Sequence, residues 1–352
     1  MWRHAAHLSD SKMTAWSIGK LDATQAPVTR RMALVGLASA TLTLGGCMSS
    51  AASRSTKDSA LSMAMQALVD DARYPLAGLS VLCLQAGRPV YEGQWGRRFI
   101  AGANGVDLPV TRDTLFRMAS VSKLIVALGV MRLVDAGKMS LDGDVADWLG
   151  YPLRHPQFPS FPITPRLLLS HRAALSDEGG YRWGPEVSLR SVLSPDGALF
   201  AKGKSWLTHA PGSFFQYCNL NFGLLASVVE RVSGQRFDRF MRSEVLSPLG
   251  MAGGFNPTHF TDDEMGHVAT LYRKRSADER WNSQGPWVPQ VDDFGGRRPT
   301  TPDVPASYVL GANGTLFSPQ GGIRTRVQDL GVVVQMLLHE GQYNGRQFLS
   351  RH

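Results

Sequence analysis

The chain has 352 residues, of which 43% are hydrophobic and 19% are charged, and its formal net charge is +8 at pH 7. These values are typical of a globular protein with a sizeable core, and they exclude an intrinsically disordered chain. The basic excess is not gathered in a run that also contains aromatic residues, so we expect no nucleic-acid partner.

Residues 1–47 are predicted to be a leader. Two arginines at positions 30 and 31 precede an apolar stretch, residues 32–44, and two glycines then precede Cys47. This order of basic, apolar and small residues is typical of a secretory signal peptide, and roughly 13 apolar residues are too few to span a bilayer. The Leu-Gly-Gly-Cys sequence at 44–47 resembles the bacterial lipobox, and residues 29–31 resemble a twin-arginine signal.

We therefore expect an exported lipoprotein that is anchored to the membrane through a lipid on Cys47 and faces the periplasm. A chance apolar stretch before an ordinary cysteine is the alternative. Residues 48–59 are rich in Ser, Ala and Thr, which predicts a flexible tether. The folded domain is then expected over residues 60–352.

The folded part begins with a helix and a hairpin. Apolar residues at helical spacing predict a helix over residues 60–71. Two short apolar segments, residues 79–85 and 90–95, flank a Gly-Arg-Pro sequence at 87–89, which predicts a β-hairpin with its turn there. Irregular structure is expected from the hairpin to Thr114.

Later segments are predicted to be mainly helical. Helical spacing of apolar residues predicts helices over residues 121–136, 220–232 and about 325–341. Gly137 and Gly234 stand where the first two helices should end, and Thr325 with Gln328 fits a capping box for the third. Strands early in the chain and helices later favour an α+β fold with a helical subdomain.

Two segments are predicted to lack long helices. Residues 152–165 contain five prolines, which a long helix cannot accommodate. Residues 280–311 are rich in Pro, Gly and Asp, which is typical of a long surface loop.

The cysteines and histidines favour neither a disulfide framework nor a metal site. Cys47, Cys83 and Cys218 are too few for the former, and the nine scattered histidines lack the spacing of a zinc site. We therefore expect no metal and no other cofactor. Cys83 lies within a short apolar segment, which predicts a buried core residue.

The strongest chemical signal is Ser120 with Lys123, at the start of the helix predicted over 121–136. Residues three apart share a helix face, so the amine can reach the hydroxyl. A serine hydroxyl becomes a good nucleophile when a neighbouring base takes its proton, and N–H groups at a helix start can help hold negative charge. Because Ser-x-x-Lys also occurs often on ordinary helix surfaces, this pair alone is a weak signal.

A second signal lies about a hundred residues later. Tyr217 and Asn219 alternate in an extended segment before the helix predicted over 220–232, so both can point the same way. An ionised tyrosine beside a lysine can act as a base, and an amide can bind a substrate carbonyl. A packed tyrosine and a capping asparagine are the alternative.

Together these motifs resemble those of class C β-lactamases, D-Ala-D-Ala carboxypeptidases and family VIII esterases. The resemblance covers about residues 60–350, and further segments at 114–123, 133–142, 163–171 and 321–330 contribute to it. It implies a β-lactamase/penicillin-binding-protein-like fold, in which an antiparallel sheet is flanked by helices. It also implies that Ser120 is the nucleophile, Lys123 assists its deprotonation, Tyr217 is the general base and Asn219 orients substrate.

The chain departs from this family in two places. Arg172-Ala173-Ala174 stands where Thr-Ser-Gly is usual, and Cys218 stands where Ser or Ala is usual. His171 is most simply a structural histidine. The family's third motif and about three strands that complete its sheet would follow Gly341, so we expect a truncated chain that folds poorly and turns over little.

The resemblance implies a serine hydrolase that forms an acyl-enzyme with a small ester, amide or peptidoglycan-like substrate. Carboxylesterase, β-lactamase and D-alanyl carboxypeptidase activities all fit this residue set. The alternative is a lipid-anchored penicillin-binding or sensor module without turnover.

Overall fold

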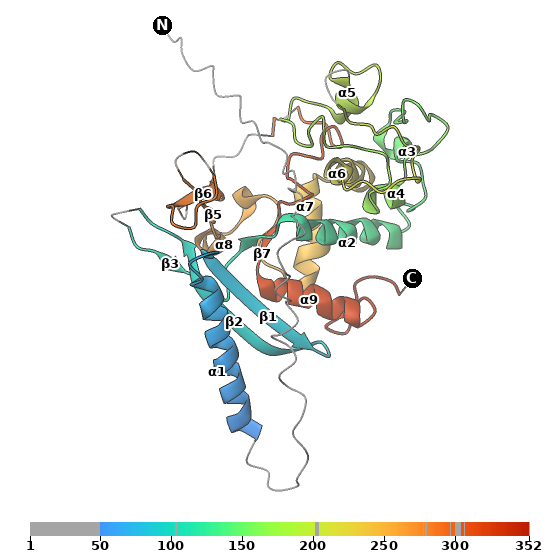
Figure 1. Ribbon diagram of the computed structural model, residues 1–352. Helices are drawn as coiled ribbons and strands as arrows, with labels where there is room; N and C mark the ends of the chain where they lie inside the picture. Colours follow the sequence, from blue (N-terminus) through green and yellow to red (C-terminus); the bar gives the residue numbers. More distant parts are fainter. Residues whose placement is uncertain are drawn as a thin grey trace, which may run out of the picture. The chain divides into compact units, whose positions relative to one another are not determined.

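The computed structural model describes residues 50–102, 105–200, 204–276, 278, 280–295, 297–299, 304–305 and 307–351. Its elements form the predicted α+β fold (Figure 1). The leader, with Cys47, lies outside the described residues. Within the described part, no helix has both the length and the apolar character needed to cross a bilayer.

A three-stranded antiparallel sheet has the order β1-β2-β3, and its strands are β1 (Gly78–Gln85), β2 (Arg88–Phe99) and β3 (Leu108–Pro109). The hairpin turn consists of Ala86 and Gly87 alone, with φ values of 49° and 73°. Positive φ at both central residues suits the right-handed twist of the flanking strands. The sequence predicted the turn at 87–89, but Pro89 belongs to β2.

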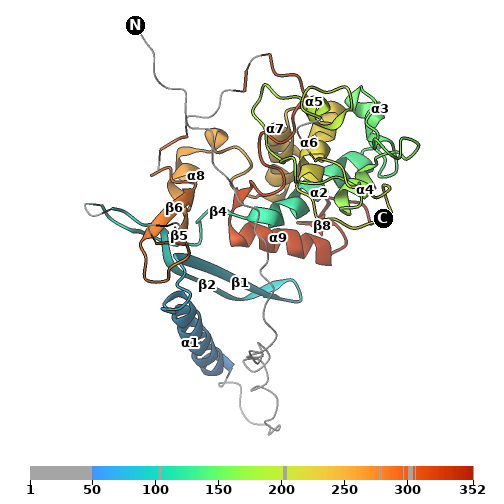
Figure 2. The ribbon, with the colours of Figure 1, turned by 45° about the horizontal axis from the view of Figure 1, so that its top comes forward.

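Helices α1 (Ser50–Val69) and α9 (Val327–Leu338) flank this hairpin (Figures 1 and 2). The Ser62 hydroxyl of α1 lies 3.0 Å from the Tyr91 hydroxyl of β2. On α9, a Cβ added at Gly331 would lie 2.5 Å from the Leu82 side chain, so a larger residue there would require Leu82 of β1 to move.

The main hydrophobic core lies in the helical part, around α2 (Ser122–Asp135) and α6 (Leu220–Ser233). Most of α6 is buried, because its apolar residues occupy every face of the helix. The shorter helices are α3 (Val145–Leu149), α4 (Pro165–Leu169), α5 (Leu189–Leu193), α7 (Phe237–Met241) and α8 (Asp262–His267).

Short strand pairs and helical turns connect these elements. The antiparallel pairs are β4 (Phe116–Arg117) with β7 (Arg324–Thr325), β5 (Leu271–Lys274) with β6 (Trp287–Val291), and β8 (Gln342–Tyr343) with β9 (Arg346–Gln347). The turns are η1 (Ala119–Val121), η3 (Arg242–Leu246), η4 (Ser247–Leu249) and η5 (Pro257–His259). The β4–β7 pair joins segments more than 200 residues apart and fixes the backbone just before Ser120.

The structure corrects four further predictions. Helix α1 begins at Ser50, because helix-forming residues such as Ala, Arg and Lys continue upstream, and it covers most of the predicted tether. Strand β6 lies within the predicted 280–311 loop, because β5 supplies its hydrogen-bonding partner. Thr325 lies in β7 rather than at a helix cap, and it donates a 2.8 Å hydrogen bond to Asp329 instead of pairing with Gln328. Cys83 is only half-buried, because β1 belongs to the three-stranded sheet and lies outside the main helical core.

Other sequence predictions are confirmed. The helices predicted over 121–136 and 220–232 are α2 and α6, to within one residue at each end. Gly137 and Gly234 have φ values of 66° and 69°, the left-handed conformation of a helix-ending glycine. Whether more strands complete the sheet beyond the described residues stays a prediction.

Candidate active site

Ser120 is held at the entrance of α2 by the turn η1. The backbone before it is pinned by the β4–β7 pair and by a 2.9 Å hydrogen bond from Met118 N to Ile323 O. Ala119 has a φ of 44°, a left-handed conformation that costs a non-glycine residue roughly 1–2 kcal/mol. Its surroundings thus impose a strained backbone that presents Ser120 to solvent.

Lys123 lies one turn along α2 and is buried, with 8% of its surface exposed. Its ammonium donates to Ser120 Oγ at 3.3 Å, to Asn219 Oδ1 at 2.9 Å and to Gln320 O at 2.7 Å. These three acceptors use all three of its N–H groups, and none of them carries a formal charge. The buried ammonium is therefore fixed in place with no direct carboxylate partner.

Tyr217 reaches Ser120 from the segment that precedes α6. Its hydroxyl lies 2.8 Å from Ser120 Oγ, and either oxygen can be the donor. The centroid of its ring lies 4.8 Å from Lys123 Nζ and 4.6 Å from the centroid of the His171 ring. The predicted residues Ser120, Lys123, Tyr217 and Asn219 thus come together in one hydrogen-bonded cluster.

Asp177, which the sequence analysis did not single out, organises the Tyr217 side of the cluster. Its carboxylate accepts hydrogen bonds from the N–H groups of Asn219 (2.8 Å) and Leu220 (3.0 Å), and from Asn219 Nδ2 (2.9 Å). A carboxylate at a helix start satisfies otherwise unpaired N–H groups and complements the helix dipole. Because Asp177 holds Nδ2, the amide oxygen of Asn219 faces Lys123.

The ring of His171 packs against the ring of Tyr217. Its Nδ1 accepts a hydrogen bond of 3.2 Å from the N–H of Cys218, and its ring also contacts Phe222. Burial, followed by the nearby positive charge of Lys123, lowers the pKa of His171 below its ordinary value of 6.5. These contacts are those of a neutral, structural histidine.

Cys218 belongs to the main hydrophobic core and is fully buried. Its thiol lies 3.2 Å from Asp177 Oδ1. Burial, and then the charge of Asp177, raise the pKa of this thiol well above its usual range. Cys218 is therefore a protonated thiol and not a competing nucleophile.

The backbone N–H of Ser120 makes no hydrogen bond to the described residues. A free N–H at the nucleophile is well placed to donate to an oxygen on which negative charge develops. Among the described residues, no three His, Cys, Asp or Glu side chains gather closely enough to hold a metal ion.

Comparisons with known proteins address the family and the fold of the chain. A family model described as Beta-lactamase matches residues 62–351. The chain is 38% identical over 157 residues to Esterase EstB of Burkholderia gladioli, covering 41% of this chain and 38% of the esterase. It is 28% identical over 174 residues to Penicillin-binding protein 4* of Bacillus subtilis (strain 168), covering 49% of this chain and 36% of that protein. Thus it spans well under two thirds of either relative.

Solved structures show the same fold. The octameric penicillin-binding protein homologue from Pyrococcus abyssi has a TM-score of 0.57 at 22% identity, covering 84% of this chain and 58% of that chain. EstCE1, described as a hydrolase with promiscuous acyltransferase activity, has a TM-score of 0.58 at 23% identity. The match covers 85% of this chain and 75% of EstCE1. At these identities the likeness concerns the fold alone.

Proposed function

We propose, since the chain belongs to the beta-lactamase family, that it is a serine hydrolase that forms an acyl-enzyme with an ester or amide. One observation carries this proposal: Ser120 Oγ lies 2.8 Å from the Tyr217 hydroxyl and 3.3 Å from Lys123 Nζ. A nucleophile within hydrogen-bonding distance of a group that can accept its proton, and beside a fixed positive charge, is an arrangement suited to acyl transfer.

We assign the general base to the ionised oxygen of Tyr217, because it is the closer of the two. Tyr217 takes the proton of Ser120, and Oγ forms a bond to the substrate carbonyl carbon. The carbonyl oxygen gains a negative charge that the free N–H of Ser120 stabilises. Lys123, whose N–H groups are held by neutral acceptors, supplies a fixed positive charge beside this exchange.

The intermediate then collapses. The bond from the carbonyl carbon to the leaving oxygen or nitrogen breaks, and the leaving group takes the proton from Tyr217. In the second half, Tyr217 takes a proton from water, the resulting hydroxide attacks the acyl carbon, and Ser120 regains its proton as the acid departs. Asn219, held by Asp177 and Lys123, is positioned to bind the substrate carbonyl or amide.

A fluorophosphonate probe and p-nitrophenyl acetate test this proposal. We expect the probe to label the chain on Ser120 and the ester to be hydrolysed, and we expect Ser120→Ala to abolish both signals. Ser122→Ala is the matched control, because Ser122 is buried and its hydroxyl accepts a hydrogen bond from Ile323 N. Labelling or hydrolysis that persists in Ser120→Ala would remove Ser120 from its role.

A penicillin-binding module without turnover is the second candidate, because one of the relatives is a penicillin-binding protein. Labelled penicillin separates the two functions. A stable penicilloyl adduct on Ser120 with no ester turnover supports the module, whereas steady turnover supports the hydrolase.

We also propose that the protein is an exported lipoprotein anchored through Cys47. The order of arginines, apolar residues, two glycines and Cys47 supports this. In cells fed labelled palmitate, the full chain should incorporate label and fractionate with membranes. Cys47→Ser should lose both properties, whereas Cys83→Ser should keep them. Unchanged fractionation of Cys47→Ser would contradict the anchor.

A further inference from the structure

One face of α6 holds a segment from much later in the chain, residues 308–323, which we call the strap. Gly223, Ser227 and Glu230 are spaced by four and three residues, so they share this face of the helix. The hydroxyl of Ser227 accepts a 2.8 Å hydrogen bond from Gly314 N, and a Cβ added at Gly314 would collide with the carbonyl of Gly223. The strap therefore packs directly on the backbone of α6.

Glu230 holds the beginning of the strap and is fully buried. Its carboxylate accepts hydrogen bonds from the Tyr308 hydroxyl at 2.6 Å and from Gly311 N at 2.7 Å, and both donors belong to the strap. A third hydrogen bond, of 2.9 Å, comes from Phe237 N at the start of α7. Burial raises the pKa of this carboxyl group above its ordinary value, and the hydrogen bonds oppose that shift only in part. Two of the three contacts that offset the burial of Glu230 thus bind the strap.

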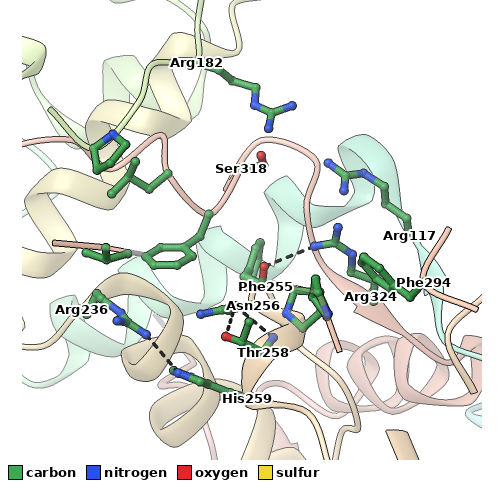
Figure 3. Close-up of a pocket in the computed structure, with 16 residues that line it drawn as sticks. Arg117, Arg182, Arg236, Phe255, Asn256, Thr258, His259, Phe294, Ser318 and Arg324 are labelled. Atoms are coloured by element: carbon green, nitrogen blue, oxygen red, sulfur yellow. Dashed lines mark hydrogen bonds between the residues drawn. The ribbon is translucent and has the colours of Figure 1, made fainter. Parts of the chain in front are cut away.

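Successive hydrogen bonds link this anchored end of the strap to its far end. Asn313 Oδ1 accepts a 3.0 Å hydrogen bond from Thr315 N. Ser318 N then donates to Thr315 O at 3.0 Å, and Gly321 N donates to Ser318 O at 2.9 Å. The chain turns at Ser318, which has a φ of 51° and is labelled in Figure 3. Because these turns are buried and bonded to one another, a shift at one end is transmitted to the other.

The far end of the strap lies against the nucleophile. Gln320 O accepts the shortest of the three hydrogen bonds from Lys123 Nζ, at 2.7 Å. Ile323 O accepts a 2.9 Å hydrogen bond from Met118 N. Asn219, which accepts another of the lysine's hydrogen bonds, stands directly before α6. Both acceptors other than the nucleophile are therefore positioned by α6, one directly and one through the strap.

We propose that Glu230 is a positioning residue for the reaction. By fixing the strap to α6, it holds Gln320 O against Lys123 and so sets where the ammonium lies relative to Ser120. Glu230 acts from a distance, since the eleven residues from Asn219 to Glu230 span about 16 Å of helix. A displacement of about 1 Å at reacting groups can lower a rate by about 100-fold. This inference rests on the proposed function and adds to it a residue that touches neither substrate nor nucleophile.

Hydrolysis of p-nitrophenyl acetate by variants of the full chain tests this role. Glu230→Met removes every acceptor oxygen at similar volume, and we expect kcat to fall at least about tenfold while KM changes less than about twofold. Glu230→Gln should restore kcat to within about threefold of the unaltered chain, because one amide oxygen can still accept both hydrogen bonds from the strap. Tyr308→Phe removes one of these bonds and should lower kcat by about threefold.

Two controls separate positioning from stability. Glu264→Met is matched to Glu230→Met, because Glu264 also accepts two backbone hydrogen bonds, of 2.8 Å each, but from donors outside the strap. Tyr343→Phe is matched to Tyr308→Phe, because Tyr343 is also half-buried and lies in β8. In each case kcat is expressed per active site titrated with a fluorophosphonate, well below the melting temperature of the variant.

Hydrogen exchange measured by mass spectrometry reports on the strap itself. We expect Glu230→Met to speed the exchange of backbone N–H groups in residues 311–321, and Glu264→Met to leave their exchange unchanged. Equal kcat per active site in these two variants would overturn the positioning role, even if exchange is faster or the melting temperature is lower. Should Glu230→Met not fold, equal kcat in Tyr308→Phe and Tyr343→Phe would overturn it in the same way.

Failure of the proposed function would look different. In that case the unaltered chain itself would neither take up the fluorophosphonate nor hydrolyse the ester, and the positioning role would fail with the hydrolase. An active unaltered chain whose kcat does not respond to Glu230→Met would overturn the positioning role alone.

Discussion

The Ser120 side of the candidate site and the Tyr217 side are built by different kinds of interaction. Ser120 and Lys123 are three residues apart at the start of one helix, so local geometry alone brings them together. Tyr217 and Asn219 depend on His171 and Asp177, which lie more than forty residues earlier. The spacing of the first pair is thus set locally, although Lys123 also donates to Gln320 O, whereas the position of the second pair depends on remote supports throughout.

Replacing the tyrosine tests the assignment of the base. Tyr217→Phe removes the hydroxyl that lies 2.8 Å from Ser120 Oγ but keeps the ring on His171. If Tyr217 is the general base, the rate of ester hydrolysis should fall by about two to four orders of magnitude. The melting temperature should change little, because 44% of the side chain surface is exposed.

Phe215→Leu is the control for this substitution, because Phe215 is exposed nearby and also contacts the His171 ring. A loss of rate as large in Phe215→Leu as in Tyr217→Phe would mean that packing around His171, and not the hydroxyl, limits the reaction. Near-normal activity in Tyr217→Phe would mean that Lys123, and not Tyr217, is the general base.

Replacing Asp177 tests whether the Tyr217 side depends on remote support. Asp177→Ala leaves the first N–H groups of α6 without their acceptor and frees Nδ2 of Asn219. We expect the free energy of unfolding to fall by about 2–4 kcal/mol. Hydrogen bonds to a charged group contribute roughly 1.5–3 kcal/mol each, and their contributions are not additive. Ester hydrolysis should also fall by about one to two orders of magnitude, seen in kcat more than in KM.

Glu178→Ala is the matched control, because Glu178 is exposed and makes only a 3.7 Å ion pair with Lys204. To separate positioning from stability, kcat is measured well below the melting temperature of each variant. A kcat for Asp177→Ala equal to that of Glu178→Ala would confine Asp177 to a stabilising role.

The same contrast explains what the sequence could predict. Ser120, Lys123 and the helices α2 and α6 follow from local spacing and from periodic apolar residues. Tyr217 and Asn219 could be placed at one site only through the family resemblance, since nothing local links them to Ser120. Asp177 was missed because its role depends on partners distant in sequence. Strand β6 was missed for the same reason, since this short strand forms only by pairing with β5.

The pH dependence of stability offers a further test of the Tyr217 side. The folded-state pKa of His171 lies below its unfolded value of about 6.5, so the unfolded chain binds this proton more readily. Its contribution is therefore fully present above pH 6.5 and is lost as the pH falls below 6.5 through the lower folded-state pKa. Thermal melts should show a falling melting temperature between pH 7.5 and 5.5.

Two variants assign this effect. His171→Gln should flatten the pH dependence, whereas His339→Gln should leave it unchanged, because His339 is exposed at the end of α9. Equal slopes for both variants would show that other groups, such as the buried His155, control stability in this range.

The smallest expected effect concerns the turn that carries His171. Ala174 has a φ of 59°, and the family resemblance described above implies glycine at this position. An alanine in this conformation is strained by roughly 1–2 kcal/mol, and glycine would relieve that strain. Part of the resulting stabilisation is lost again, because glycine has greater conformational freedom in the unfolded chain. Ala174→Gly should therefore raise the free energy of unfolding by about 0.5–1 kcal/mol in urea titrations.

Ala173→Gly is the matched control, since Ala173 is equally buried but has no positive φ. This substitution should lower the free energy of unfolding instead. If both variants lose stability alike, the left-handed turn carries no strain that glycine can relieve, and the support of His171 must come from packing alone.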